Sequence, residues 1–162
     1  MGLETDIRNM LEASGVAHEI IPCDPALADT AVFCDHYGYS PDISANTIIV
    51  KSKTGEQKYA ACVVLATTRL DVNKTVRKKL AARKVSFATT EEAEKLTGMT
   101  SGGVMPLLLP GGLPLWIDAR IMDLDRVILG GGSRSLKVIV EPAVFATLAG
   151  TEIVPGLALD IN

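Results

Sequence analysis

Aromatic residues, histidines and cysteines are all scarce in this chain, and each scarcity excludes a class of function. Phe, Trp and Tyr make up 4% of the 162 residues, so the core must be aliphatic and a base-stacking RNA module is not indicated. The two histidines, His18 and His36, have no histidine partner at helical spacing, which argues against a metal centre. The three cysteines, Cys23, Cys34 and Cys62, include no C-x-x-C pair, which argues against a zinc ribbon or a disulfide framework. We therefore expect neither a metal nor a cofactor.

A strong net charge, a long apolar run and a basic leader are missing as well. Sixteen Lys and Arg against nineteen Asp and Glu give a net charge of -3, the wrong sign for indiscriminate binding to DNA. No apolar run approaches the roughly 20 residues that cross a bilayer, and the first residues carry acids where a secretory signal carries bases. The sequence predicts one domain over residues 1–162, located in the cytoplasm and without a membrane partner. Any contact with nucleic acid must come from a local patch.

Helical and strand patterns alternate irregularly along the chain. Helices are predicted where apolar residues recur at helical spacing between a cap or proline and a glycine: from Leu3 to a stop at Gly15, Thr30 to His36, after an Asp71 cap with the stripe Val72, Val76 and Leu80, Thr89 to Gly98, and Pro142 to Gly150. Strands are predicted for the short β-branched and apolar runs His18–Pro22, Asn46–Val50, Tyr59–Leu65, Val85–Ala88, Arg126–Leu129, Leu136–Val140 and Glu152–Val154. The second and third of these strands are expected to pair as an antiparallel hairpin.

The order of these elements indicates the fold class. Helices and strands do not follow the strict β-α-β alternation of a doubly wound parallel sheet. The strands are also short, and glycine and proline crowd the segment from Gly98 to Asp118. We therefore predict an α+β fold with a mixed, partly closed, barrel-like sheet flanked by helices.

Two glycine-rich segments are candidates for chemistry. The triplet Gly130-Gly131-Gly132 has two interpretations, a phosphate-binding loop or a generic turn, since glycine amides approach an anion closely. The triplet is followed by a strand and not by a helix, so the dinucleotide fingerprint is missing. Gly102-Gly103 belongs to neither a Walker sequence nor a nucleophile elbow. These absences weaken the nucleotide-binding and hydrolase classes that use those motifs.

Six of the sixteen basic residues lie between positions 74 and 84. They surround the apolar stripe of the predicted helix that follows Asp71. Such a helix either presents a solvated face or receives a phosphate backbone. Both interpretations stay open at this point.

Read together, these pieces resemble the YbaK-type family, which includes the editing domain of bacterial prolyl-tRNA synthetases and its free-standing relatives. The most specific match is Thr97-Gly98 followed by Gly102-Gly103-Val104-Met105-Pro106, which fits the family's Gly-x-x-x-Pro loop. The remaining matches are spread over the chain in the family's order: Thr30-Ala31, residues 45–50, the basic helix, residues 114–118, the glycine triplet and Leu148-Ala149-Gly150.

The resemblance implies a function and a set of site residues. Family members hydrolyse the ester that joins a wrong amino acid to a tRNA, without a metal or a covalent nucleophile. The loop from Gly102 to Pro106 is then expected to hold the aminoacyl end through backbone groups, while water is positioned with help from the terminal hydroxyl of the tRNA. The partner implied is the 3′ aminoacyl end of a tRNA, with an aminoacyl-tRNA synthetase as a further candidate. The resemblance points to Gly102, Gly103, Pro106 and Asn46 as catalytic residues, and to Thr47, Val104, Met105, Asp118, Gly131, Gly132, Lys58 and Lys78 as substrate-binding residues.

Position 46 departs from the family pattern. Relatives carry Ala-Lys-Thr in the first hairpin strand, with the lysine serving the terminal phosphate and the reaction, whereas this chain has Ala45-Asn46-Thr47. Asparagine supplies neutral hydrogen bonds but no charge. Lys51 lies at an odd offset in the same strand, so its side chain is expected on the opposite face. Lys58 or a residue of the basic helix is expected to compensate.

Two hypotheses follow from different classes of protein. The first is a free-standing aminoacyl-tRNA deacylase with an altered site. The second is a non-catalytic relative that binds an aminoacyl-adenosine end, a nucleotide or a protein partner in the same cleft, and the neutral Asn46 favours it. An unrelated enzyme on the same fold is a third, weaker alternative.

Overall fold

The computed structural model describes residues 2–100 and 103–161. Its α-helices are α1 (Leu3–Ser14), α2 (Thr30–Tyr37), α3 (Arg77–Leu80) and α4 (Thr90–Thr97), and single 3-10 turns or short 3-10 helices occupy several of the connections. Its strands are β1 (His18–Pro22), β2 (Ala45–Ser52), β3 (Tyr59–Leu65), β4 (Thr68–Leu70), β5 (Val85–Phe87), β6 (Leu115–Asp118), β7 (Val127–Gly130), β8 (Leu136–Val140), β9 (Thr151–Val154) and β10 (Ala158–Asp160). No helix in these two described ranges is long and apolar enough to cross a membrane.

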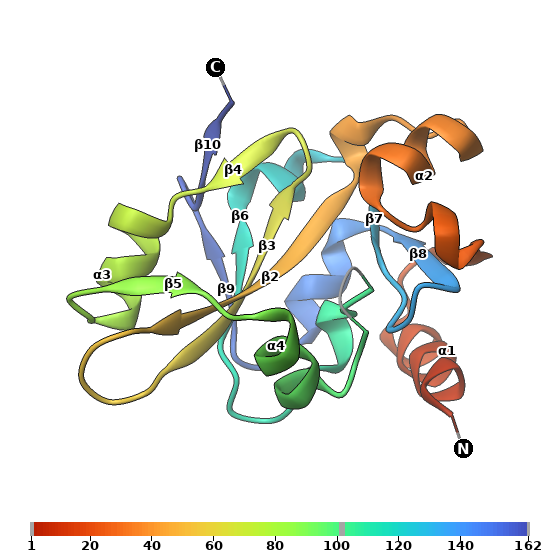
Figure 1. Ribbon diagram of the computed structural model, residues 1–162. Coiled ribbons are helices and arrows are strands. Elements are labelled where there is room, and N and C mark those ends of the chain that lie inside the picture. Colours follow the sequence, from red (N-terminus) through yellow and green to blue (C-terminus); the bar gives the residue numbers. More distant parts are fainter. Residues whose placement is uncertain (1, 101–102, 162) are drawn as a thin grey trace.

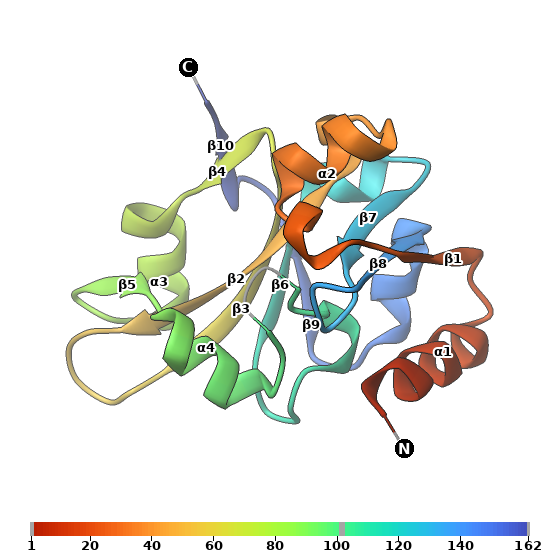
Figure 2. The same ribbon diagram turned by 45° about the vertical axis from the view of Figure 1, so that its right-hand side comes forward.

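The strands form a mixed arrangement of sheets, which confirms the α+β prediction. The largest sheet has the order β5-β2-β3-β6-β9, with β2 and β3 paired as the predicted antiparallel hairpin and β3, β6 and β9 running parallel. A three-stranded sheet has the order β1-β8-β7, and β10 pairs with β4. An isolated parallel bridge between Ser44 and Ile128 links the start of β2 to β7. Within the described ranges the strands curve around one another without closing into a barrel (Figures 1 and 2).

Local sequence signals account for most helix boundaries. The Thr89 hydroxyl accepts a bond from the Glu92 N–H at 3.1 Å and the Thr89 N–H donates to the Glu92 carboxylate at 2.9 Å, which is a complete capping box for α4. Gly98 then ends the helix at a φ of 72°, a backbone conformation that favours glycine. Both ends of α4 were predicted from these residues.

Other boundaries differ from the prediction. The Asp71 carboxylate does not cap the backbone of the basic helix but accepts a bond from the Thr75 hydroxyl at 2.8 Å, and the segment Val72–Val76 is a π-helix that precedes α3. The helix predicted to run from Pro142 to Gly150 is a 3-10 helix over Pro142–Thr147. Strands β4 and β10 were not predicted, because each is only three residues long and is formed by pairing with the other.

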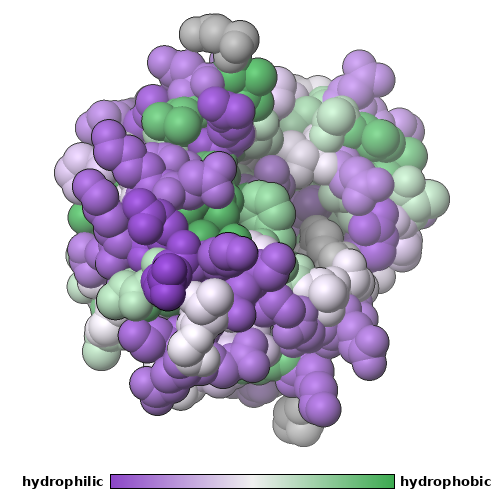
Figure 3. All heavy atoms as spheres, turned by 60° about the vertical axis from the view of Figure 1, so that its left-hand side comes forward, coloured by the Kyte–Doolittle hydropathy of each residue, from purple (hydrophilic) through white to green (hydrophobic). Residues whose placement is uncertain are grey.

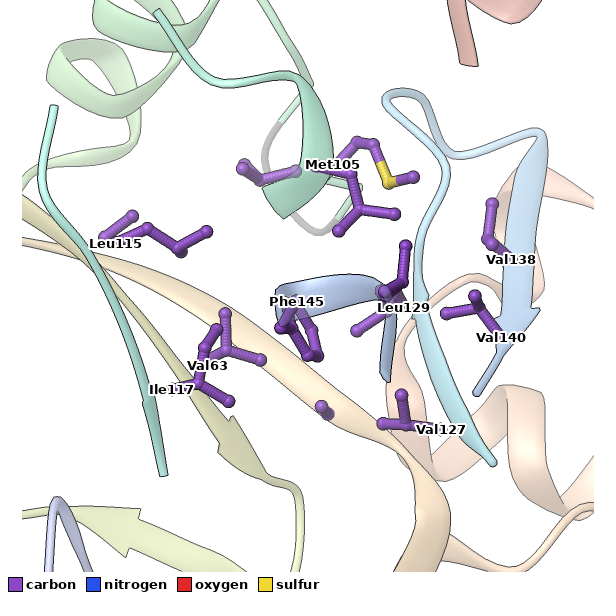
Figure 4. Close-up of a cluster of buried hydrophobic side chains, with 14 of the residues drawn as sticks. Val63, Met105, Leu115, Ile117, Val127, Leu129, Val138, Val140 and Phe145 are labelled. Carbon is purple, nitrogen blue, oxygen red and sulfur yellow. The ribbon is translucent and has the colours of Figure 1, made fainter. Parts of the chain in front are cut away.

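The main core lies between the five-stranded and the three-stranded sheets (Figure 4). Val63 and Ile117 from the larger sheet face Leu129 and Val140 from the smaller one, with Phe145 between the two groups. Burial of each such side chain stabilises the fold by about 1.5–3 kcal/mol. A second cluster packs under α3 on the other face of the large sheet, and a third packs between α2 and the outer face of β7 and β8. Helix α2 thereby lies beside the start of β2.

Candidate active site

The described part of the family loop is fixed against the glycine triplet. A Cβ on Gly103 would lie 2.5 Å from the Ser133 carbonyl oxygen, and a Cβ on Gly130 would lie 2.6 Å from the Val104 carbonyl oxygen. The Gly132 N–H donates to the Gly103 carbonyl oxygen at 2.5 Å. Backbone therefore meets backbone with no room for side chains, and this is the physical reason for glycine on both sides. Gly102, predicted to be the first residue of the loop, lies outside the described residues.

The other two triplet positions are also used for packing. A Cβ on Gly131 would lie 2.6 Å from the Leu136 carbonyl oxygen, and Gly132 has a φ of 89° beside the side chain of Leu3. The triplet thus connects the loop, β8 and α1. These contacts support the interpretation of the triplet as a tight turn that holds its neighbours, and the chain continues into β8 with no helix N-terminus to bind a phosphate.

The side chains of the loop point into the protein. Val104 and Met105 belong to the main core, and Met105 is fully buried, with its N–H donating to the sulfur of Met99 at 3.0 Å. Pro106 is buried and begins a 3-10 turn over Pro106–Leu108. A ligand can therefore meet this part of the loop only through its backbone. Figure 3 shows that the molecular surface is hollowed on one face, where apolar and hydrophilic side chains meet.

Asn46 lies near the start of β2 and is exposed. The Thr30 hydroxyl of α2 donates a hydrogen bond to the Asn46 Oδ1 at 2.9 Å. The amide oxygen thus accepts one bond, and the amide NH₂, which has no hydrogen-bond partner among the described residues, is the donor that Asn46 can offer to a ligand. Thr47 is half-buried on the opposite face of the strand, together with Ile49 of the main core.

The side chain of Arg134, in the loop that follows the triplet, contacts the segment that precedes α2. Its guanidinium lies 3.1 Å from the Asp29 carboxylate, directly before α2, and donates from Nε to the Pro25 carbonyl oxygen at 3.0 Å. The start of β2, the N-terminus of α2, the triplet and the family loop are therefore linked by direct contacts. No role for Arg134 or for the Thr30 side chain was predicted from the sequence, because their partners lie 105 and 16 residues away along the chain.

The lysines considered as substitutes for a charge at position 46 lie elsewhere. Lys51 is on the opposite face, as predicted, and its ammonium lies 2.6 Å from the Glu92 carboxylate. Hydrogen bonds from Lys51 and from the Thr89 backbone lower the pKa of Glu92 to about 2. Lys58 donates to the Leu80 carbonyl oxygen at 3.1 Å, at the far end of the hairpin and about 20 Å along the strand from Asn46.

The remaining basic candidate, Lys78, belongs to the four-residue helix α3. This helix packs on the second cluster, on the other face of the large sheet from the family loop. Lys78 is exposed there, so the structure places it on the outer surface of the basic helix and does not bring it to Asn46.

Asp118 ends β6 and is completely buried. Neither carboxylate oxygen has a hydrogen-bond partner among the described residues, and the closest cation is the Arg120 guanidinium at 3.9 Å. Burial raises the pKa of Asp118, and the neighbouring Arg120 partly offsets this effect. The structure does not expose this carboxylate to a ligand.

The thiols are buried and free. Burial raises the pKa of Cys62 to about 12, and burial likewise raises the pKa values of Cys23 and Cys34, so none of them is an activated nucleophile. Among the described residues no group of three or more His, Cys, Asp or Glu side chains is arranged to hold a metal ion. The chemistry available at the linked segments is therefore that of backbone groups, the neutral Asn46 amide, hydroxyls and the Arg134–Asp29 ion pair.

Solved structures with the same fold support the architecture. The hypothetical protein APE2540 superposes with a TM-score of 0.81 over 94% of this chain and 99% of its own, at 23% sequence identity. A protein described as a proposed trans-editing enzyme for prolyl tRNA synthetase superposes with a TM-score of 0.79 over 100% of this chain and 99% of its own, at 19% identity. At these identities the likeness establishes the fold class.

The family follows from the sequence match. Residues 24–148 match the model of the aminoacyl-tRNA editing domain, which covers most of the chain and includes Asn46, the loop and the triplet. The chain belongs to the aminoacyl-tRNA editing domain family, which confirms the YbaK-type resemblance.

Proposed function

We propose that this protein is a deacylase that hydrolyses the ester bond of a mischarged aminoacyl-tRNA. The observation that carries the proposal is the family loop, which is locked by backbone contacts to the triplet while its side chains are buried. Such a loop offers a ligand rigid backbone groups at fixed positions. Family membership supports the substrate class, the aminoacyl end of a tRNA.

The proposed mechanism needs no covalent enzyme intermediate. An aminoacyl ester is an activated acyl group, so its hydrolysis depends mainly on orientation of the attacking water and on stabilisation of the oxyanion. Within the Gly102–Pro106 loop the Gly103 N–H already donates to the Thr100 carbonyl oxygen and the Met105 N–H to the Met99 sulfur, so the Val104 N–H would stabilise the oxyanion. The terminal hydroxyl of the tRNA would help to position the water, and no metal is assigned a step. The amide NH₂ of Asn46, whose oxygen is held by Thr30, would donate a neutral hydrogen bond to the substrate.

A binding function is the second candidate, and the neutral side chain at position 46 favours it. Loss of one charge-assisted contact costs about 1.5–3 kcal/mol, or roughly ten- to hundred-fold in rate, if nothing replaces it. In that case the segments around Asn46 and the family loop would bind an aminoacyl-adenosine end without hydrolysing it. We place either activity in the cytoplasm, with a synthetase as a further candidate partner.

Single-turnover hydrolysis of a panel of mischarged tRNAs tests the proposal. The panel includes alanine and cysteine on proline tRNA, and the variants are Asn46→Ala and Gly102→Ala, with Gly111→Ala as a control in an open loop. We expect hydrolysis of at least one species, lost in Gly102→Ala and kept in Gly111→Ala. Hydrolysis no faster than the protein-free rate for every species, with binding of the aminoacyl-adenosine end retained, would establish the binding module instead.

A further inference from the structure

Lys137 of β8 is a buried cation without an acceptor. Its side chain is 6% exposed, and no described residue accepts a hydrogen bond from its ammonium, which lies 5.3 Å from the centroid of the Phe33 ring. Burial lowers the pKa of Lys137. Lysine is rarely buried without a paired charge, and the Lys137 nitrogen is not itself sealed from the surface, so it is free to bind an anion from outside the fold.

The side chain of Lys137 starts on the outer face of the small sheet, the face that Ile139 and the α2 residue Phe33 share. Gly130 of β7 is directly opposite Lys137 in the antiparallel ladder, and directly paired residues project to the same face. A Cβ on Gly130 would lie 2.6 Å from the Val104 carbonyl oxygen and 2.8 Å from the Gly103 carbonyl carbon. Lys137 is therefore next to the backbone of the loop.

Strand β7 also lies against the start of β2. The isolated parallel bridge joins Ser44 to Ile128, each two residues before Asn46 and Gly130 respectively. Neighbouring strands lie about 4.8 Å apart, so β2 and β8, on either side of β7, are about 10 Å apart in this region. Gly130 has no side chain, and the Gly103–Val104 backbone of the loop lies over it. The four-carbon stem of Lys137 reaches over part of the distance between the strands.

Helix α2 contacts both Asn46 and Lys137. Thr30 and Phe33 lie three positions apart, on one face of this helix. Thr30 donates its hydroxyl to Asn46, and the ring of Phe33 lies below the Lys137 ammonium. One helix face thus contacts the neutral amide and the unpaired cation together.

We propose that Lys137 supplies the positive charge that position 46 lacks, and that its ammonium binds the terminal phosphate of the tRNA 3′ end beside the Asn46 amide. The inference deepens the proposed function and rests on it for the identity of the ligand. It explains why the site keeps a buried lysine while Lys51 and Lys58 are bound elsewhere. In this view the phosphate-binding lysine is on β8, two strands away from β2, the strand that carries it in relatives.

Binding of a matched pair of stable ligands tests the charge directly. The probes are 3′-alanylamino-3′-deoxyadenosine with and without a 5′-phosphate, and calorimetry gives the Kd of each for the full chain. We expect the parent to prefer the phosphorylated probe by roughly ten- to hundred-fold. In Lys137→Met this preference disappears, and Lys137→Arg keeps part of it. Lys53→Met, which alters an exposed lysine of the β2–β3 loop, keeps the parent values.

A double variant tests whether a lysine at position 46 can replace Lys137. Adding Asn46→Lys to Lys137→Met returns the charge to the position that relatives use, so we expect the phosphate preference to return. Lys137→Met removes a buried ammonium without a partner and is expected to melt at or above the temperature of the parent. A purely structural lysine would change the melting temperature and leave the phosphate preference as it is.

The outcomes separate this inference from the proposed function. Lys137 is excluded as the phosphate ligand if Lys137→Met keeps the preference, or if the parent shows no preference or binds neither probe. A Lys137-dependent preference in a parent that hydrolyses no mischarged tRNA supports the inference and contradicts the deacylase. Hydrolysis that is unaffected by Lys137→Met supports the deacylase and contradicts the inference.

Discussion

Gly103→Ala is expected to disturb the loop through a contact that the structure defines. The added Cβ would lie 2.5 Å from the Ser133 carbonyl oxygen and 2.7 Å from its carbonyl carbon. Real Cβ atoms essentially never approach closer than 3.0 Å, so the gap must open by at least about 0.5 Å. Both neighbours are backbone, and no flexible side chain can move aside. The family loop and the Ser133 turn must therefore separate.

The sizes of the expected losses of stability and activity in Gly103→Ala follow from this contact between two backbone segments. Forcing an extra carbon into a close-packed site costs typically about 1–3 kcal/mol of unfolding free energy. The same separation stretches the bond from the Gly132 N–H to the Gly103 carbonyl oxygen. Displacement of a catalytic group by about 1 Å lowers a rate by about a hundred-fold. We therefore expect a folded variant with a modest loss of stability and a loss of deacylation of ten-fold or more.

Urea denaturation and single-turnover deacylation measure the two effects side by side. Gly111→Ala is the matched control, because a Cβ there meets nothing within 4 Å, so its stability should stay the same or rise by about 0.4–1 kcal/mol. If Gly103→Ala matches the parent in both assays, the close contact does not hold the loop and the argument from backbone packing fails.

Three further predictions concern single side chains. Lys51 and the Thr89 backbone lower the pKa of Glu92 to about 2. Glu92 therefore stabilises the fold above its unfolded pKa near 4.5, and this contribution is lost as the pH falls towards 2. The urea midpoint of Glu92→Gln should fall less steeply than that of the parent between pH 4.5 and pH 2. Burial raises the pKa of Asp118, so its charged form opposes folding at neutral pH. Asp118→Asn should raise the urea denaturation midpoint at pH 7, and should raise it less near pH 4, where the parent carboxyl is protonated more often. Thr30→Val removes the donor to Asn46, and kcat/KM should fall while the unfolding free energy changes by less than about 1 kcal/mol.

Each of these predictions has a control. Glu91→Gln alters a neighbouring exposed acid of α4 and should keep the steep acid decline of the parent. Asp123→Asn alters an acid of the β6–β7 connection, outside the strands, and should leave the midpoint at pH 7 unchanged. Thr30→Ser retains a hydroxyl and should recover most of the activity lost in Thr30→Val. Equal behaviour of a test variant and its control would contradict the interaction assigned to that residue.

Sequence patterns determined the elements whose signals are local. The capping box and Gly98 define α4 because both ends of the helix bond to residues within four positions. Strict side-chain alternation placed Lys51 on the opposite face from Asn46, since a strand has a period of two. The short β4 and β10 carried no such signal, because three residues fit many conformations and only their mutual pairing selects the strand.

The candidate site was likewise predicted only in part. The loop motif and the departure at Asn46 could be recognised in the sequence, because the first is a pattern of residue types and the second is a residue type that differs from the family pattern. The role of the triplet was not, since a turn and a phosphate loop use the same glycines and only the approach of Gly103 to Ser133 distinguishes them. Lys137 appears in sequence as an ordinary strand residue. The pairing of β7 with β8 places it opposite Gly130 and the packing of α2 places it near Phe33, because contacts between distant segments form only when the chain folds.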